Sequence, residues 1–323
     1  MREDCCGYTA AVSCFISGKT YHYSRYVCAG KLRDQDSIGT GPYTEVSMNL
    51  EEKYQKLKQI LAGYGSAAIA FSGGVDSTFL MYAAREALGD RACAITANAE
   101  AVPDSEIREA VEYCAACGIR HKVLTVTQMD IPGFAENSEE RCYLCKKALF
   151  GQILNTAARM GCAVVAEGSN SDDDHDYRPG MRAIRELGVM SPLREAHLSK
   201  ADIRALSRQF HLPTSSKPSF ACLATRIPYG DKITEQKLRM AELGEQYLRE
   251  LGFAQVRVRV HDTMARIEVA QTDIGRLAAE PVRSQVYERL REIGFTYICA
   301  DLKGYRTGSM NEVLDESVLH RIY

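Results

Sequence analysis

The sequence contains no tryptophan, only 9 prolines and almost no excess of either charge. Its 40 Lys and Arg residues stand against 42 Asp and Glu residues, so the net charge of −2 provides no general basic surface for nucleic acid. No uninterrupted apolar run approaches the roughly 18–20 residues that a membrane-spanning helix requires. The opening residues MREDCCGYTA also lack the long apolar core of a signal peptide. We therefore expect a cytoplasmic protein without a membrane partner, and nothing in the charge balance favours a nucleic-acid partner.

Cysteine, by contrast, is abundant, with 12 residues in a chain of 323. Cytoplasmic cysteines are kept reduced, so we interpret them as thiols, metal ligands or catalytic groups and not as a disulfide framework. Hydrophobic residues make up 46% of the chain and charged residues 25%, which is typical of a folded globular protein. This length is sufficient for two domains with separate cores.

The hydrophobic pattern divides the chain into parts of different character. Residues 1–47 carry four cysteines and no sustained period, and we interpret them as a disordered extension or an artefact of the assigned translation start. From residue 67 onward, predicted strands alternate with helices. This βαβ alternation predicts an α/β fold, a parallel sheet with helices on both faces, followed by a smaller C-terminal α+β domain. The expected boundaries are 1–47 for the extension, 48–216 for the α/β domain, 217–231 for an active-site loop or linker, 232–315 for the α+β domain and 316–323 for a tail.

The most informative motif is SGGVDS at residues 72–77, which follows an apolar strand pattern and opens a predicted helix. Glycines in such a loop let backbone N–H groups close on a phosphate, and the helix N-terminus adds partial positive charge. The carboxylate in the motif is expected to face a cation such as Mg²⁺ or to cap the helix. An ordinary glycine turn is the alternative. The residues assigned to this phosphate site are Ser72, Gly73, Gly74, Asp76 and Ser77.

The motif SGGVDS resembles the PP-loop of the N-type ATP pyrophosphatases, which cleave ATP between its α- and β-phosphates and leave AMP on an acceptor oxygen. Five further segments, in one order along the chain, together resemble the LarE-type sulfurtransferases, which make the sulfur donors of a nickel-pincer nucleotide cofactor. They are EGSNSDDDHDYRPG (167–180), SPLREAHLSKADIRAL (191–206), KPSFACLATRIPYG (217–230), VRVRVHDTMARIEV (256–269) and ADLKGYRTGSMN (300–311). The resemblance implies a PP-loop fold and a homo-oligomer built through the C-terminal domain.

The resemblance also implies the chemistry. A carboxylate of pyridinium-3,5-biscarboxylic acid mononucleotide would attack ATP with Mg²⁺ as cofactor, and sulfur would then displace AMP to give a thiocarboxylate. Other enzymes of cofactor biosynthesis are possible partners. We assign Ala97, Asn98 and Gly168, at predicted strand ends, to the ATP site. Lys217 is assigned to neutralise departing pyrophosphate or AMP, with a surface lysine in a linker as an equal alternative.

Several charged residues are candidates for binding the anionic substrate. Arg257 and Arg259 lie two residues apart on a predicted strand, so both project from one face and can hold a phosphate or carboxylate. The alternative is a solvated outer face of an amphipathic strand. Arg226, in the linker, is a second anion-binding candidate, with a surface loop charge as its alternative. We also expect Asp176 and Arg178, in a polar loop after a predicted strand, to face nucleotide or substrate.

Three cysteines are candidates for supplying the sulfur. Cys142 and Cys145 form a C-x-x-C pair within reach of one metal or cluster, and Cys222 lies in the predicted active-site loop. The resemblance implies two routes: a [4Fe–4S] cluster that these three thiolates hold, with one iron open for sulfide, or Cys222 alone, which gives up its own sulfur. A structural zinc site and spectator thiols are the alternatives. We expect Lys146 and Lys147 to lower the thiol pKa values.

Two carboxylates in the C-terminal domain are further candidates, and other functions of a PP-loop protein must be weighed. Glu245 and Asp301 are candidate metal ligands or general bases, singled out only because they lie in matching segments. A PP-loop tRNA thiolase would also combine this loop with three cysteines, although the near-neutral charge opposes RNA binding. A ligase like NAD synthetase would not need the cysteines. The intact SGGVDS motif opposes a non-enzymatic binding or storage module.

Overall fold

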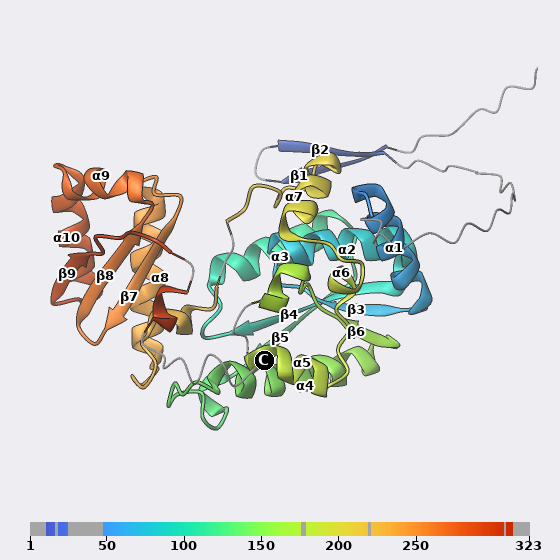
Figure 1. Ribbon diagram of the computed structural model, residues 1–323, viewed down its shortest axis with the longest axis horizontal. Coiled ribbons are helices and arrows are strands. Elements are labelled where there is room, and N and C mark those ends of the chain that lie inside the picture. Colours follow the sequence, from blue (N-terminus) through green and yellow to red (C-terminus); the bar gives the residue numbers. More distant parts are fainter. Residues whose placement is uncertain are drawn as a thin grey trace, which may run out of the picture.

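The computed structural model describes residues 48–175, 179–218, 221–306 and 308–312, together with the strand backbone of 11–16 and 19–24. Two bodies lie side by side along the long axis of the molecule, and each has its own sheet (Figure 1). The larger body holds the sheet that contains β3 to β6, and the smaller one holds β7 to β9 with three helices.

The larger sheet is wholly parallel, as the βαβ alternation predicts. Its strand order is β5–β4–β3–β6, and each neighbouring pair runs in the same direction. Because the strands are parallel, their carboxyl ends meet at one edge, where α/β sheets bind their ligands. The strands are β3 (Ala67–Ala70), β4 (Ala92–Ala99), β5 (His121–Val126) and β6 (Val164–Ala166).

Helices cover both faces of this sheet, which confirms the predicted α/β class. Ala67 and Ile69 of β3 belong to a core shared with α1, α2, α3 and α7, whereas Ala68 belongs to a second core with α4 and α5. This alternation follows from the two-residue period of a strand that is buried on both sides. The helices are α1 (Leu50–Gly63), α2 (Val75–Leu88), α3 (Asp104–Ala116), α4 (Arg141–Arg159), α5 (Pro179–Glu186), α6 (Pro192–Glu195) and α7 (Lys200–Gln209).

Helix α5 begins inside residues 168–181, which the sequence predicts as a polar loop, and α6 lies where the sequence predicts no helix or strand. Both are short, and each begins at a proline, whose fixed φ favours the first turn of a helix. Ile184 of α5 is buried in a core with residues of α4 and β6, so tertiary packing stabilises a helix too short to show a clear period.

The smaller body is the expected α+β unit. β7 and β8 pair antiparallel, and β8 pairs in parallel with β9. Val256, Val258 and Val260 face a core made with α8 and α10. At Gly244 a Cβ atom would lie 3.3 Å from Val258, so glycine lets α8 approach the sheet closely. The elements are α8 (Glu235–Glu250), β7 (Val256–His261), β8 (Met264–Val269), α9 (Ile274–Ala278), α10 (Val282–Ile293) and β9 (Tyr297–Ala300).

The remaining described elements are one short strand pair near the N-terminus and several 3₁₀ turns. Strands β1 (Ala11–Ile16) and β2 (Lys19–Ser24) pair antiparallel inside the region expected to be disordered; both contain aromatic residues, which favour strands. The remainder of 1–47 lies outside the described residues. No helix in the described part is long and apolar enough to cross a membrane. The 3₁₀ turns are η1 (Gly89–Arg91), η2 (Gln128–Asp130), η3 (Ser171–His175), η4 (Leu223–Arg226), η5 (Gln271–Asp273) and η6 (Ser309–Asn311).

Candidate active site

The phosphate loop, residues 72–77, connects β3 to α2 at the carboxyl edge of the sheet. Gly73 has a φ of +69°, a left-handed conformation that favours glycine. The Ser77 hydroxyl lies inside the loop, where it accepts from the Ser72 amide at 3.3 Å and donates to the Gly74 carbonyl at 3.2 Å. No side chain caps the N-terminus of α2. Its first amides and its dipole are therefore directed at the space where a phosphate would bind.

Gly168, just after β6, lies against the first turn of α2. A Cβ atom at this position would come within 3.1 Å of the Ser77 amide nitrogen and 3.2 Å of the Asp76 Cβ. Such distances are shorter than ordinary van der Waals contact, so any other residue would displace the phosphate loop. The structure thus places Gly168 beside the loop, next to the site to which the sequence assigned it.

Asp76 forms an ion pair with Lys200, the first residue of α7. The other carboxylate oxygen of Asp76, Oδ1, is buried and accepts no hydrogen bond. Lys200 has no sequence signal for a role at this site, because its only local feature is the helix start marked by the Ser199–Asp202 capping box. A lysine beside the phosphate loop adds a mobile positive charge where ATP phosphates would lie.

The Asp76 carboxylate also offers a partial fit to Mg²⁺. No three His, Cys, Asp or Glu side chains converge on one point among the residues with described side chains. Mg²⁺ in nucleotide sites is typically held by one or two carboxylates together with substrate phosphates and water. The unpartnered Asp76 oxygen suits this mode, in which ATP brings most of the ligands.

Lys217, at the start of the predicted linker, contacts the phosphate loop through its side chain. Its ammonium group donates to the Gly73 carbonyl at 3.2 Å and to the carboxylates of Glu106 at 2.8 Å and Glu109 at 2.7 Å, both on α3. Burial raises the pKa of Glu106, and the Lys217 charge opposes this rise. Lys217 is therefore not a free surface lysine but is held at the edge of the loop.

A cavity of about 340 Å³ opens at the carboxyl ends of β4 and β5, where both bodies meet. Asn98 and Thr125 line it from the sheet, and Leu238 and Glu242 line it from α8. The Glu242 carboxylate also accepts from the Asp104 amide at 3.0 Å, across the boundary between the bodies. Asn98 thus lines a space between the two bodies, while the predicted contacts of Ala97 and Asn98 with adenosine stay predictions.

The three candidate cysteines come from two segments that pack together. Cys142 and Cys145 lie in the first turns of α4, and the exposed Cys222 precedes η4. Cys145 packs against the core that contains Leu223 and Ala224. Cys142 and Cys222 lie close enough to Cys145 for their charges to act on its thiol, but among the described residues no three His, Cys, Asp or Glu side chains form a metal-ion site.

The Cys145 thiol is not acidified. Burial raises its pKa to about 11, the charges of Cys222 and Cys142 act in the same direction, and a hydrogen bond from Gln128 opposes them. The expectation that the neighbouring lysines lower the thiol pKa values is wrong for Cys145. Lys147 instead donates to Tyr143 of α4 and to Glu186 of α5, in exposed hydrogen bonds.

Arg226 is fully buried and binds the backbone of residues 221–225, which we call the cysteine loop. Its guanidinium binds both oxygens of Glu245, at 2.6 and 3.0 Å, and donates to the carbonyls of Ala221 at 3.0 Å and Cys222 at 3.3 Å. The alternative of a surface loop charge is therefore wrong. Glu245 also accepts from Arg249, and its pKa is held low by Arg226 against the opposing effect of burial.

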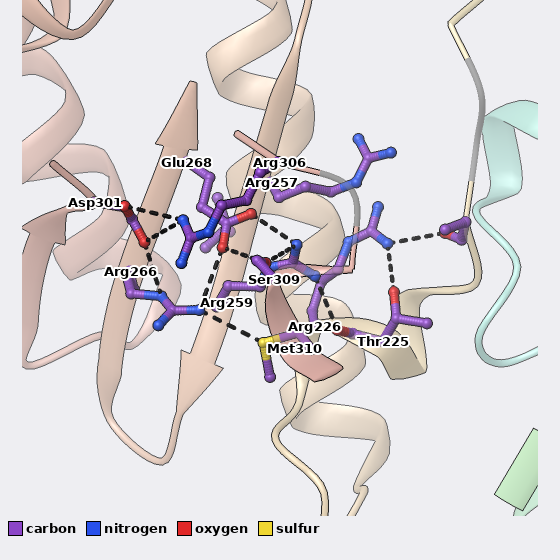
Figure 2. A network of polar contacts seen from close by, with 12 residues as sticks. Thr225, Arg226, Arg257, Arg259, Arg266, Glu268, Asp301, Arg306, Ser309 and Met310 are labelled. Atoms are coloured by element: carbon purple, nitrogen blue, oxygen red, sulfur yellow. Dashed lines mark hydrogen bonds and ion pairs between the residues drawn. The ribbon is translucent and has the colours of Figure 1, made fainter. Parts of the chain in front are cut away.

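The other face of β7 and β8 carries Arg257, Arg259 and Arg266, which we call the arginine face (Figure 2). Arg257 is 7% exposed and Arg259 is 5% exposed, so the alternative of a solvated outer face is wrong. Arg259 donates to Glu268 at 2.7 Å, to Ser309 at 2.9 Å and to the Thr225 carbonyl in the cysteine loop at 2.9 Å. Burial, with repulsion from nearby arginines, lowers the pKa of Arg257 to about 10.

The remaining candidates are placed as follows. Asp301 accepts from Arg306 at 3.3 Å and pairs with Arg266 at 3.7 Å at the edge of the arginine face (Figure 2). Glu245 and Asp301 therefore stand in ion pairs with arginines. Asp176 and Arg178 lie outside the described residues.

Comparison with known proteins agrees with this geometry. No established family profile matches the sequence. An uncharacterised protein of Synechocystis sp. is 38% identical over 265 residues, or 82% of this chain and 99% of that protein. The pyridinium-3,5-bisthiocarboxylic acid mononucleotide synthase of Lactiplantibacillus plantarum is 34% identical over 271 residues, or 84% of this chain and 98% of the synthase.

A more distant relative shares the nucleotide-binding part. The argininosuccinate synthase of Haloarcula marismortui is 28% identical over 149 residues, 43% of this chain and 35% of that enzyme. This partial match is consistent with the PP-loop sheet and its use of ATP. The chain, which matches the Lactiplantibacillus synthase along almost its entire length, belongs to the LarE-type sulfurtransferases of the PP-loop superfamily.

Proposed function

We propose that this enzyme uses ATP to convert a carboxylate of pyridinium-3,5-biscarboxylic acid mononucleotide into a thiocarboxylate. The observation that carries the proposal is the 34% identity over 98% of a synthase whose name gives the bisthiocarboxylic acid mononucleotide as product. The phosphate loop, Lys200 and Lys217 supply the groups that an ATP-dependent reaction needs at one edge of the sheet.

The first step is adenylylation of the substrate. A carboxylate oxygen attacks the α-phosphorus of ATP, the bond to the bridging oxygen breaks, and pyrophosphate leaves with its negative charge. The α2 amides and the hydroxyl of Ser72 hold the phosphates, and Asp76 holds Mg²⁺. Lys217 and Lys200 stabilise the charge that develops on pyrophosphate.

The arginine face binds the anionic end of the mononucleotide. Arg257 and Arg259 are close enough to oppose each other's charge, which an incoming phosphate or carboxylate would relieve. Asp176 and Arg178 are further candidates for contact with the substrate. Arg226 contributes by holding the cysteine loop on this face, because its guanidinium is buried against Glu245. A metal at Glu245 or Asp301 would require their arginine pairs to open.

In the second step a sulfur nucleophile attacks the acyl carbon, and AMP leaves with the former carboxylate oxygen. Three thiolates of Cys142, Cys145 and Cys222 would hold a [4Fe–4S] cluster, which supplies sulfide when bound. The alternative source is the sulfur of Cys222 itself, in the loop before η4. We further propose that the protein is a cytoplasmic homo-oligomer that shares its substrate with other enzymes of cofactor biosynthesis.

The test uses protein purified without oxygen, Mg-ATP and the dicarboxylated mononucleotide, with the intact-protein mass and the small-molecule products recorded together. Thiocarboxylate with an unchanged chain mass, sustained by added sulfide, would support the three-cysteine cluster. Loss of one H₂S from the peptide that contains Cys222 would support the sacrificial route. If neither thiocarboxylate nor AMP forms, the proposed substrate is wrong.

A further inference from the structure

A buried asparagine joins the segment before α4 to the loop that follows the cysteine of the linker. Asn137 is fully buried, with a φ of +55°. Its side-chain nitrogen donates to the carbonyl oxygens of Pro228 at 2.6 Å and Asp231 at 2.9 Å, and its backbone carbonyl accepts from the Gly230 amide at 3.1 Å. One side chain thus fixes the course of a loop about 90 residues away.

Arg141 extends this connection to the cysteines. It is 3% exposed, and its guanidinium donates to the Asn137 side-chain oxygen and to the Ala224 carbonyl at 3.1 Å. The same guanidinium lies 3.6 Å from the sulfur of Cys142 and over the ring of Tyr229 at 5.2 Å. Arg141 therefore contacts one cysteine directly and the backbone two residues beyond Cys222.

This arrangement connects the two distant segments that carry Cys142 and Cys222. Cys142 follows Arg141 directly in α4, and Ala224 is two residues after Cys222. A guanidinium offers five N–H groups in a rigid fork, so it can bind both segments at once, which a lysine cannot.

We propose that Asn137 and Arg141 are positioning residues that hold the Cys142 segment and the Cys222 loop in register for sulfur transfer. The described contacts of their side chains lie within residues 137–142 and 224–231, and none is with the phosphate loop. This role deepens the proposed function by naming what aligns its sulfur site. It predicts that their loss separates the two cysteine segments but leaves adenylylation intact.

The first readout is proximity and does not depend on activity. The full chain, kept reduced and treated with an iron chelator, is reacted with dibromobimane, a short reagent that joins two thiols, and the linked peptides are identified by mass spectrometry. In the wild type we expect both Cys142–Cys145 and Cys142–Cys222 links. In Arg141→Met the link to Cys222 should fall about tenfold, as expected for loss of charged hydrogen bonds, while the link within α4 persists.

The second readout separates the two chemical steps. In Arg141→Met, thiocarboxylate formation should fall by at least about tenfold, and pyrophosphate release in a single turnover should change less than about twofold. Asn137→Asp, which keeps the oxygen that faces Arg141 but loses both N–H donors, should act in the same way. Arg141→Lys should restore only part of the loss. The matched control is Arg182→Met, because Arg182 also contacts the start of α4 but is half-exposed.

Two results would overturn the proposal. One is a Cys142–Cys222 link that is absent from the wild type or equally strong in Arg141→Met. The other is an equal loss of pyrophosphate release and thiocarboxylate in both variants, which would indicate general misfolding. If the wild type makes no thiocarboxylate at all, the proposed substrate fails, and the cross-linking result still decides whether Arg141 holds the two segments together.

Discussion

The phosphate loop and the arginine face both present positive charge to a ligand, but they do so with different parts of the chain. In the loop the charge comes from backbone amides at the N-terminus of α2, which no side chain caps. On the arginine face and at the neighbouring Arg226 it comes from buried guanidinium groups. Glu268 balances Arg259, and Glu245 balances Arg226. Backbone amides are neutral and cost little to bury, whereas each buried arginine must be paired.

This difference has a consequence for stability. The phosphate loop depends on close packing, because a side chain at position 168 would collide with the first turn of α2. The arginine face depends on charge balance, since removal of one carboxylate leaves an arginine buried without its partner. We therefore expect the two regions to fail in different ways when they are mutated.

The largest expected effect is on folding and comes from Glu245→Gln. Because Glu245 and Arg226 are fully buried, loss of the carboxylate charge should reduce the free energy of unfolding by about 3–5 kcal/mol near neutral pH. Urea denaturation would measure this. Glu250→Gln, on the exposed side of the same helix, is the control and should change the value by less than about 0.5 kcal/mol. Equal effects of the two variants would contradict a role for burial.

The same variant should change the pH dependence of stability. Arg226 holds the pKa of Glu245 below its ordinary value of about 4.3. The stabilisation is therefore present above that ordinary value and is lost as the pH falls through the lower, folded-state pKa. Wild-type protein should lose more stability than Glu245→Gln between about pH 5 and about pH 3. Parallel curves for the two proteins would mean that Glu245 does not titrate as described.

The next largest effect is on catalysis and comes from Gly168→Ala. The added Cβ would displace the first turn of α2, and a shift of about 1 Å in a phosphate site can reduce the rate about 100-fold. Pyrophosphate release is the measurement. Gly151→Ala is the control, since a Cβ at Gly151 in α4 meets no atom within 4 Å. A normal rate in Gly168→Ala would show that α2 can move without loss of function.

The sequence predicts the backbone-built region well because its signals are local. The glycines and serines of SGGVDS lie in six consecutive positions, and the strand before them and the helix after them have clear periods. The parallel sheet follows from the order of these elements. Helix α5 was missed, because its stability comes from contact with α4 and not from its own pattern.

The side-chain-built regions could be predicted only in part. The two-residue spacing of Arg257 and Arg259 places them on one face, but nothing local shows that Thr225 and Ser309 cover that face. Lys200 and Asp76 are 124 residues apart, so their pairing exists only in the folded chain. Arg141 had no signal other than its position beside Cys142. Long-range pairs between charged residues are set by topology, which a single sequence does not display.

A moderate effect is expected from Lys200→Met. Loss of the ammonium group removes a positive charge beside the phosphate loop, so KM for Mg-ATP should rise about tenfold, while thermal stability should change little because Asp76 and Lys200 are partly exposed. Lys122→Met, an exposed lysine on β5, is the control. An unchanged KM would place the Lys200 ammonium outside the ATP site and would leave it a purely structural partner of Asp76.

The smallest effect on stability is expected for the solvent-exposed ion pair between Lys217 and Glu109. The Glu109 side chain that holds Lys217 is 56% exposed, so Glu109→Gln should cost no more than about 0.5 kcal/mol, and added salt should remove the difference. The effect of Glu106→Gln should depend less on salt, because the side chain of Glu106 is only 10% exposed and its bond to Lys217 is shielded from water. Urea titrations at low and high salt would measure both. If salt weakened the Glu245→Gln effect as strongly as that of Glu109→Gln, the pair of Glu245 and Arg226 would have to be open to solvent. The contrast between a buried charge network and a backbone-built loop would then fail.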